Sequence, residues 1–144
     1  MMNEDTKKLL DEDNAGIKMA VASFHEILPK VKNEQLRQRL IACRQEHEQL
    51  GDETHRILSE YDARGKDPSP IAKGMSWIKT NVTLSVDPSD SAVADLMIDG
   101  CNMGVKSLNR YLNQYKTADA QIKGITEQLI RSEDRLAADL RTFL

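Results

Sequence analysis

Residues 36–61, LRQRLIACRQEHEQLGDETHRILSEY, decide the fold class of this chain. One set of side chains recurs in this stretch at alternating steps of four and three residues: Leu36, Leu40, Cys43, His47, Leu50, Thr54, Ile57 and Tyr61. Such spacing places side chains on one face of an α-helix. Asn33 precedes the stretch and is a suitable N-cap for its first turn. The stretch predicts a long amphipathic helix that carries one imidazole, that of His47, on its inward face.

Three further stretches show the same helical spacing. The first covers residues 8–32, where Pro29 is expected to kink or fray the last turn. The next is expected to be capped by Asp90 or Ser91, and the last follows Thr117. Their expected inward side chains are Leu10, Ile17, Val21, Phe24, Leu28 and Val31; then Val93, Met97, Gly100, Gly104, Leu108, Tyr111 and Tyr115; then Ile122, Ile125, Leu129, Glu133, Leu136, Leu140 and Phe143. We therefore expect four long helices.

Residues 63–90 separate the second and third of these helices and are too long for a simple turn. Asp-Pro pairs stand at 67–68 and 87–88, and a short helix is expected between them. Its expected apolar side is formed by Ile71, Met75, Ile78 and Val82, with Trp77 beside them. A connection of this length can return to the other end of the molecule, which would make the second and third helices parallel. The alternative is up-down-up-down packing, with the short helix as a cap.

The composition is that of a single helical domain spanning residues 1–144. Hydrophobic residues make up 40% of the chain, which is enough for a core, whereas aromatic residues make up only 4%. Charged residues make up 30%, a mixture typical of packed helices. Two cysteines, Cys43 and Cys101, lack the spacing of a metal site and are expected to be small buried side chains.

The charge pattern excludes several classes of partner. The net charge of −3 comes from mixed signs without a basic block, so nucleic acid is not an expected partner. The acidic N-terminus has no secretory signal, and no apolar run is long enough to span a membrane. We expect a soluble cytoplasmic protein with no membrane partner.

The run EHEQLGDETH, residues 46–55, separates into an inward and an outward half. At about 100° per residue, His47 lies roughly 30° from the centre of the inward face and Glu46 roughly 70° from it. Asp52 and His55 lie roughly 170° and 110° away, so both are expected in water.

Acidic residues of two other helices are the candidate neighbours of His47. Glu133 stands near the centre of the inward face of the last helix, and Asp13 stands beside that of the first. At about 1.5 Å per residue, Glu133 and the glycines at 100 and 104 reach the depth of His47, and Asp13 lies about a turn and a half deeper. The prediction is that His47 faces Glu133 beside a glycine wall, with Glu46 at the rim and Asp13 as a distant candidate.

This set has two interpretations. The first is a buried, hydrogen-bonded histidine–carboxylate pair, because an unpaired buried charge is strongly unfavourable. The second is a metal site, because imidazole and carboxylate bind iron, manganese or zinc. The first is favoured, since one histidine and one inward carboxylate are few ligands for a tight site. No metal or other cofactor is therefore firmly expected, although Fe, Mn or Zn is considered at His47, Glu133, Glu46 and Asp13.

The chain resembles the ferritin-like superfamily, in particular its small single-domain bacterial branches of unknown function. The resemblance rests on DNAGIKMAVASF in the first helix, LRQRLIACRQEHEQL in the second, GMSWIK in the connection and GCNMGVKSLNRYL in the third. It implies an all-α, ferritin-like four-helix bundle with a long crossover between helices two and three that contains a short helix. Active members hold two irons with a glutamate on helices one and three and a Glu-x-x-His on helices two and four.

Carried over to this sequence, the iron-binding pattern is largely replaced. His47 matches the histidine of helix two, but Arg44 stands where its glutamate is needed. Cys101 stands at the glutamate position of helix three, and Glu133 stands at the histidine position of helix four, three residues after Ile130. On helix one the residues at the right depth are Ile17 and Val21. These departures weigh against ferroxidase, oxygenase and peroxidase activity.

The expected function is that of a ferritin-like bundle with a degenerate di-iron site: a non-catalytic structural, binding or stress-related protein and a homodimer. The alternative is a metal-binding protein that handles iron, manganese or zinc, or does redox chemistry, with His47 and Glu133. A third hypothesis is a partner-binding module with adaptable methionines, which are Met19, Met75, Met97 and Met103. We find no phosphate-binding loop, nucleophile motif or Cys-x-x-Cys in the sequence.

Overall fold

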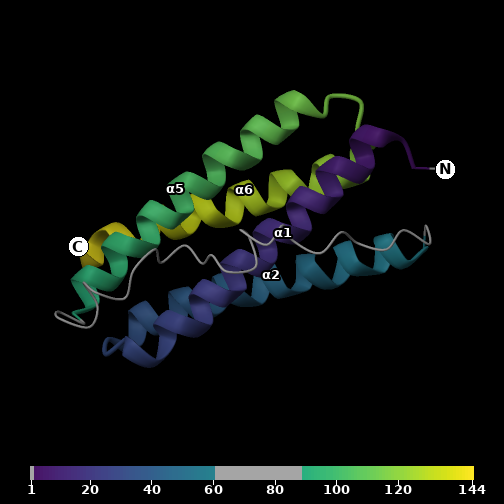
Figure 1. Ribbon diagram of the computed structural model, residues 1–144. Coiled ribbons are helices and arrows are strands. Elements are labelled where there is room, and N and C mark those ends of the chain that lie inside the picture. The colour runs from purple at the N-terminus through teal and green to yellow at the C-terminus, as the bar shows by residue number, and fades with distance from the viewer. Residues whose placement is uncertain (1, 61–88) are drawn as a thin grey trace.

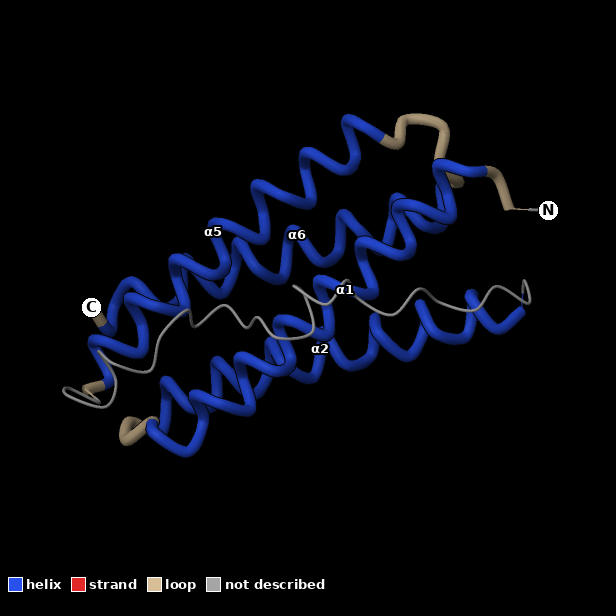
Figure 2. The backbone as a smooth tube through the Cα atoms, in the orientation of Figure 1, coloured by secondary structure: helices blue, strands red, loops and turns tan. Residues whose placement is uncertain are grey.

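The computed structural model describes residues 2–60 and 89–144, and these residues form four long α-helices (Figure 1). The helices are α1 (Glu4–Ile27), α2 (Glu34–Glu60), α5 (Asp90–Gln114) and α6 (Ala120–Leu140). Single 3₁₀ turns follow α1 and α6, namely η1 (Leu28–Lys30) and η2 (Arg141–Phe143). Figure 2 shows no strand among the described residues, so the all-α class predicted from the sequence is confirmed. The short helix predicted around Ile71–Ile78 lies outside the described residues.

The beginning of α1 is tied to the turn between α5 and α6. The Thr117 backbone N–H and hydroxyl donate hydrogen bonds to Asp5 Oδ2 at 3.0 and 2.6 Å. The Asp119 N–H donates to Thr6 Oγ1 at 2.8 Å. Since α1 and α6 both begin at this end, they run in the same direction (Figure 1).

The opposite end is tied by the carboxylate of Asp90, the first residue of α5. The N–H groups of Lys32 and Asn33, in the turn between α1 and α2, donate to Asp90 Oδ1 and Oδ2 at 2.9 and 3.0 Å. Helices α2 and α5 therefore both begin at this end and run in the same direction. Up-down-up-down packing would make them antiparallel, so that alternative is wrong.

Helix boundaries follow polar caps. Asn33 caps α2 as predicted, accepting the Leu36 N–H at 3.0 Å. For α5 the cap is Ser89, which accepts the Ala92 N–H at 3.1 Å, so the prediction of Asp90 or Ser91 was wrong by one residue or two. The reason lies in a tertiary contact, because the Asp90 carboxylate already accepts hydrogen bonds from the turn between α1 and α2. The first helix begins at Glu4 rather than residue 8, because Asn3 accepts the Thr6 N–H at 2.8 Å.

The apolar interior is divided into two clusters. One lies toward the Asp90 end and contains Phe24, Leu40, Cys43, Cys101 and Leu136 among others. The second lies toward the Asp5 end and contains Leu10, Ile17, Leu50, Leu108 and Leu129 among others. Along three helices the clusters meet at one polar or glycine position, which is His47 in α2, Gly104 in α5 and Glu133 in α6. The centre of the bundle is therefore a polar layer between two apolar ones.

None of the described helices has both the length and the apolar character that a membrane-spanning segment needs. Cys43 and Cys101 are free and buried, which confirms the prediction that both thiols are small interior side chains.

Candidate functional site

The candidate site is the polar layer, and its centre is a contact between α2 and α6. His47 Nε2 lies 3.3 Å from Glu133 Oε2. The two residues are 0% and 4% exposed, so water does not screen the interaction. The sequence placed both side chains on inward faces at one depth, and the structure brings them into contact.

The imidazole of His47 is held at both ring nitrogens. Nδ1 lies 2.9 Å from the carbonyl oxygen of Cys43, one turn earlier in α2. A carbonyl only accepts hydrogen bonds, so Nδ1 carries a hydrogen and donates it. The edge of the ring packs against Phe24 of α1, with ring centroids 5.8 Å apart. The orientation of His47 is thus set by its own helix and by α1, and Nε2 is left pointing at Glu133.

Burial and hydrogen bonding act in opposite directions on this pair. Burial by itself lowers the pKa of His47, but its interactions with the side chains of Cys43 and Glu133 outweigh burial and raise the pKa to about 10. Burial raises the pKa of Glu133, and the hydrogen bond from His47 opposes that rise. We describe the pair at neutral pH as an imidazolium donating to a carboxylate.

Gly104 of α5 makes room for the second oxygen of Glu133. A Cβ atom at position 104 would overlap Glu133 Oε1, so a larger residue cannot stand there unless the carboxylate moves. Oε1 is buried and has no hydrogen-bond partner among the described residues. The predicted glycine wall is therefore real at Gly104, and it accommodates a carboxylate oxygen rather than a helix crossing alone.

Two further polar side chains join the layer, and the sequence analysis did not assign them to it. Cys43 Sγ lies 3.4 Å from Ser132 Oγ and 3.6 Å from His47 Nδ1. Cys43 could have been found, because it lies one turn before His47 on the same face. Ser132 is adjacent to Glu133, and only the packing of α2 against α6 brings it to Cys43.

The order thiol, imidazole, carboxylate resembles that of a cysteine nucleophile with its base. The base in such a site must accept the thiol proton at the ring nitrogen nearest the sulfur. That nitrogen is Nδ1, which already donates its hydrogen to the Cys43 carbonyl. His47 therefore cannot act as a general base toward Cys43 in this arrangement.

The remaining candidates lie elsewhere. Asp13 is fully buried, but it is hydrogen-bonded to Thr126, which precedes Glu133 by seven residues or roughly 10 Å along α6. Glu46 is partly exposed and faces Arg135 at 3.4 Å, so it stands at the rim as predicted. Asp52 and His55 are exposed, as the helical angles predicted.

The residues present do not fit a di-iron centre. Among the described residues, no group of three or more His, Cys, Asp and Glu side chains is gathered closely enough to hold a metal ion. Arg44, which stands three residues before His47, is a cation that cannot ligate a metal and pairs with Glu48 at 3.0 Å. Cys101 is fully buried, and burial raises the pKa of its thiol, which keeps it protonated.

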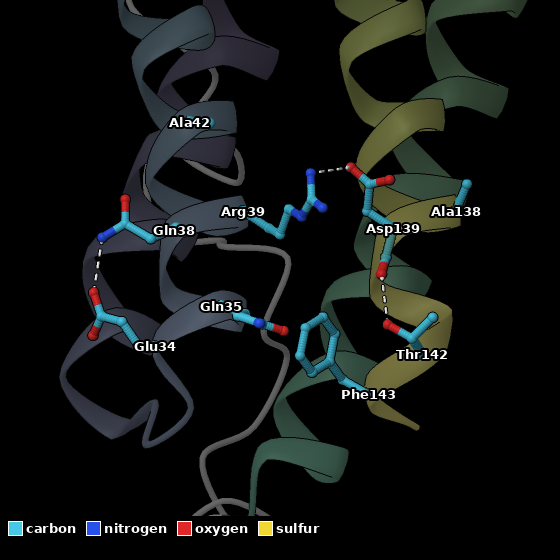
Figure 3. A pocket seen from close by; sticks show the side chains of 9 residues that line it. All are labelled: Glu34, Gln35, Gln38, Arg39, Ala42, Ala138, Asp139, Thr142 and Phe143. Atoms are coloured by element: carbon cyan, nitrogen blue, oxygen red, sulfur yellow. Dashed lines mark hydrogen bonds and ion pairs between the residues drawn. The ribbon is translucent and has the colours of Figure 1, made fainter.

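A separate groove of about 600 Å³ lies at the surface between the start of α2 and the end of α6 (Figure 3). It is lined by Glu34, Gln35, Gln38, Arg39, Ala42, Ala138, Asp139, Thr142 and Phe143. Arg39 and Asp139 approach to 3.8 Å across it. Arg39 precedes His47 by two turns of α2, so the groove is distinct from the polar layer.

Comparisons with protein-family models, with curated proteins and with solved structures find no match to this chain.

Proposed function

We propose that this chain is a ferritin-like four-helix bundle in which the di-iron site has been replaced by a histidine–glutamate pair. In this proposal it is a cytoplasmic, non-catalytic protein with a structural, binding or stress-related role. The parallel direction of α2 and α5 supports the ferritin-like part, because bundles with one long connection have this arrangement.

The observation that carries the proposal is the hydrogen bond between His47 and Glu133. Both ring nitrogens of His47 donate hydrogen bonds to protein oxygens, so neither is available to bind a ligand. A buried pair of opposite charge is kept together because either member alone would be an uncompensated charge. In this role the pair positions α2 against α6 and takes no part in a reaction.

Metal titration tests the proposal. Purified protein would be titrated with Fe(II), Mn(II) and Zn(II) by calorimetry, beside the variants His47→Ala and His55→Ala. We expect no stoichiometric metal site in wild-type protein or in either variant. Tight binding that is lost in His47→Ala and kept in His55→Ala would overturn the proposal, because His55 is exposed on the same helix.

The proposal includes a homodimer, which follows from the ferritin-like resemblance. Sedimentation equilibrium at micromolar concentration tests this part separately. A mass of twice 16.2 kDa is expected, and a monomer at all concentrations would contradict the dimer while leaving the role of the pair unaffected.

A second candidate function is the binding and handling of iron, manganese or zinc at His47 and Glu133. The observation that favours it is Glu133 Oε1, a buried carboxylate oxygen with no hydrogen-bond partner among the described residues. Metal binding would require His47 Nε2 to give up its hydrogen, so affinity would rise with pH. An anomalous-scattering map of crystals grown with Zn(II) or Mn(II) decides the matter: a peak between α2 and α6 supports this candidate, and its absence contradicts it.

A further inference from the structure

Asp13 is a second buried carboxyl group, and it lies away from the polar layer. Its side chain on α1 is fully buried. Oδ2 lies 2.7 Å from the Thr126 hydroxyl on α6, and Oδ1 has no hydrogen-bond partner among the described residues. Asp13 is thus a polar contact between two helices that the His47–Glu133 pair does not involve.

The contacts of the Thr126 hydroxyl are compatible with a protonated Asp13. The Thr126 hydroxyl lies 3.2 Å from the Ile122 carbonyl oxygen of its own helix as well as 2.7 Å from Asp13. A hydroxyl has one hydrogen to donate, and a carbonyl can only accept. If Asp13 is protonated, its O–H donates to Thr126 and Thr126 donates to Ile122, so both hydrogens have acceptors. If Asp13 is ionised, Thr126 is its single donor among the described residues.

Among the described residues, no cation acts on the Asp13 carboxyl group. The charged groups that act on it are Glu12 on its own helix and Glu133 on α6, and both are acidic. No group of α2 or α5 is among them, and Tyr111 of α5 is hydrogen-bonded to Glu12. Burial is the largest effect and, with these two carboxylates and against the Thr126 hydrogen bond, raises the pKa of Asp13 to about 8.

We propose that Asp13 is a proton-dependent contact between α1 and α6: its protonated carboxyl holds the two helices together, and loss of the proton near neutral pH weakens the bundle. The contribution is complete below the unfolded pKa of 3.8 and is lost as the pH rises through about 8. Between these limits unfolding releases one proton, so the unfolding equilibrium constant rises about tenfold per pH unit. The inference is independent of the proposed function.

The variant Asp13→Asn tests the proposal because an amide keeps the shape of the carboxyl and has no proton to lose. Its N–H can donate to Thr126 as the protonated acid does. Urea unfolding of both proteins from pH 5 to pH 9 gives the ratio of their unfolding constants, wild type over variant. We expect this ratio to rise about tenfold per pH unit between pH 5 and pH 7 and to level off above pH 8. A ratio that stays constant with pH would overturn the proposal.

Two further measurements keep the test decisive. Asp99→Asn is the matched control, since Asp99 is exposed on α5, and its ratio to wild type should not change with pH. If Asp13→Asn does not fold, the carboxyl carbon of Asp13 in wild-type protein can be titrated by ¹³C NMR. A midpoint near pH 8 supports the proposal, and a midpoint below pH 6 rules it out.

Discussion

Two buried carboxyl groups, one carried by α6 and one packed against it, differ in their surroundings. Glu133 projects from α6 toward an imidazole that donates a hydrogen bond to it at 3.3 Å. Asp13 projects from α1 toward Thr126 of α6 and has a neutral hydroxyl as its partner. Burial raises the pKa of both groups, but within residues 2–60 and 89–144 only Glu133 has a basic neighbour that opposes the rise. Helix α6 thus carries a carboxylate at the level of Glu133 and contacts a protonated acid at Thr126, two turns earlier.

The difference shows how burial alone leaves the charge of an acidic side chain undecided. A carboxylate is tolerated inside a protein when a cation shares its site, and otherwise the group takes up a proton. Each arrangement depends on a different atom, so each can be broken separately. The following predictions start with the largest expected effect.

Removing the imidazole of His47 should lower the unfolding free energy the most. His47→Ala leaves Glu133 buried without its partner, and breaking a buried pair in this way typically costs about 3–5 kcal/mol of unfolding free energy. Urea denaturation at pH 7 measures the loss. His55→Ala, an exposed histidine on the same helix, should stay within about 0.5 kcal/mol of wild type. A loss below about 1 kcal/mol in His47→Ala would mean that the pair is not ionised.

Filling the space beside Glu133 should lower the unfolding free energy by less than removing the imidazole does. Gly104→Ala places a methyl group where Glu133 Oε1 lies, and overpacking of this kind costs about 1–3 kcal/mol. Gly124→Ala is the matched control, since nothing lies within 4 Å of its added Cβ, and it should stabilise the helix by up to about 1 kcal/mol. In a Glu133→Ala background the cost of Gly104→Ala should disappear. A cost that persists there would show that the clash is with another group.

The pH dependence of stability should separate the effect of Asp13 from that of the His47–Glu133 pair. In Asp13→Asn, the main remaining effect below pH 9 is that of His47, whose pKa is about 10 in the folded protein and 6.5 in the reference state. A raised histidine pKa contributes stability that is complete below pH 6.5 and is lost as the pH rises toward 10, at about 1.4 kcal/mol per pH unit. Urea midpoints from pH 6 to pH 10 measure this. A stability that does not fall above pH 7 would contradict an imidazolium at His47.

Removing the hydroxyl partner of Asp13 should have the smallest effect. Thr126→Val keeps the shape of the side chain and leaves the neutral Asp13 carboxyl without an acceptor, at a cost of about 1–2 kcal/mol at pH 6. Thermal or urea unfolding measures it. In the part of the chain that the structure describes, Thr126 is the single donor to an ionised Asp13, so the cost should increase at pH 9. A cost that is equal at both pH values would argue that Asp13 does not ionise there.

Much of the site could be predicted from the sequence because helical angles and depths depend only on residue spacing. The separation of His47 from Asp52 and His55 needed no more than about 100° per residue. The contact of His47 with Glu133 followed from comparing depths. The partner of Asp13 could not be found in this way, because Thr126 carries no charge and is one of two hydroxyl side chains on α6. The α5 cap was misplaced for a similar reason, since Asp90 binds a turn 57 residues away.

By itself, the sequence determined the helices, their buried faces and the level at which an imidazole and a carboxylate would meet. These properties follow from periodicity, which is local. The tertiary structure decided which atom each buried oxygen would meet, and therefore which carboxyl keeps a charge. That outcome depends on distances of about 3 Å between helices, and a spacing pattern along the chain does not specify them.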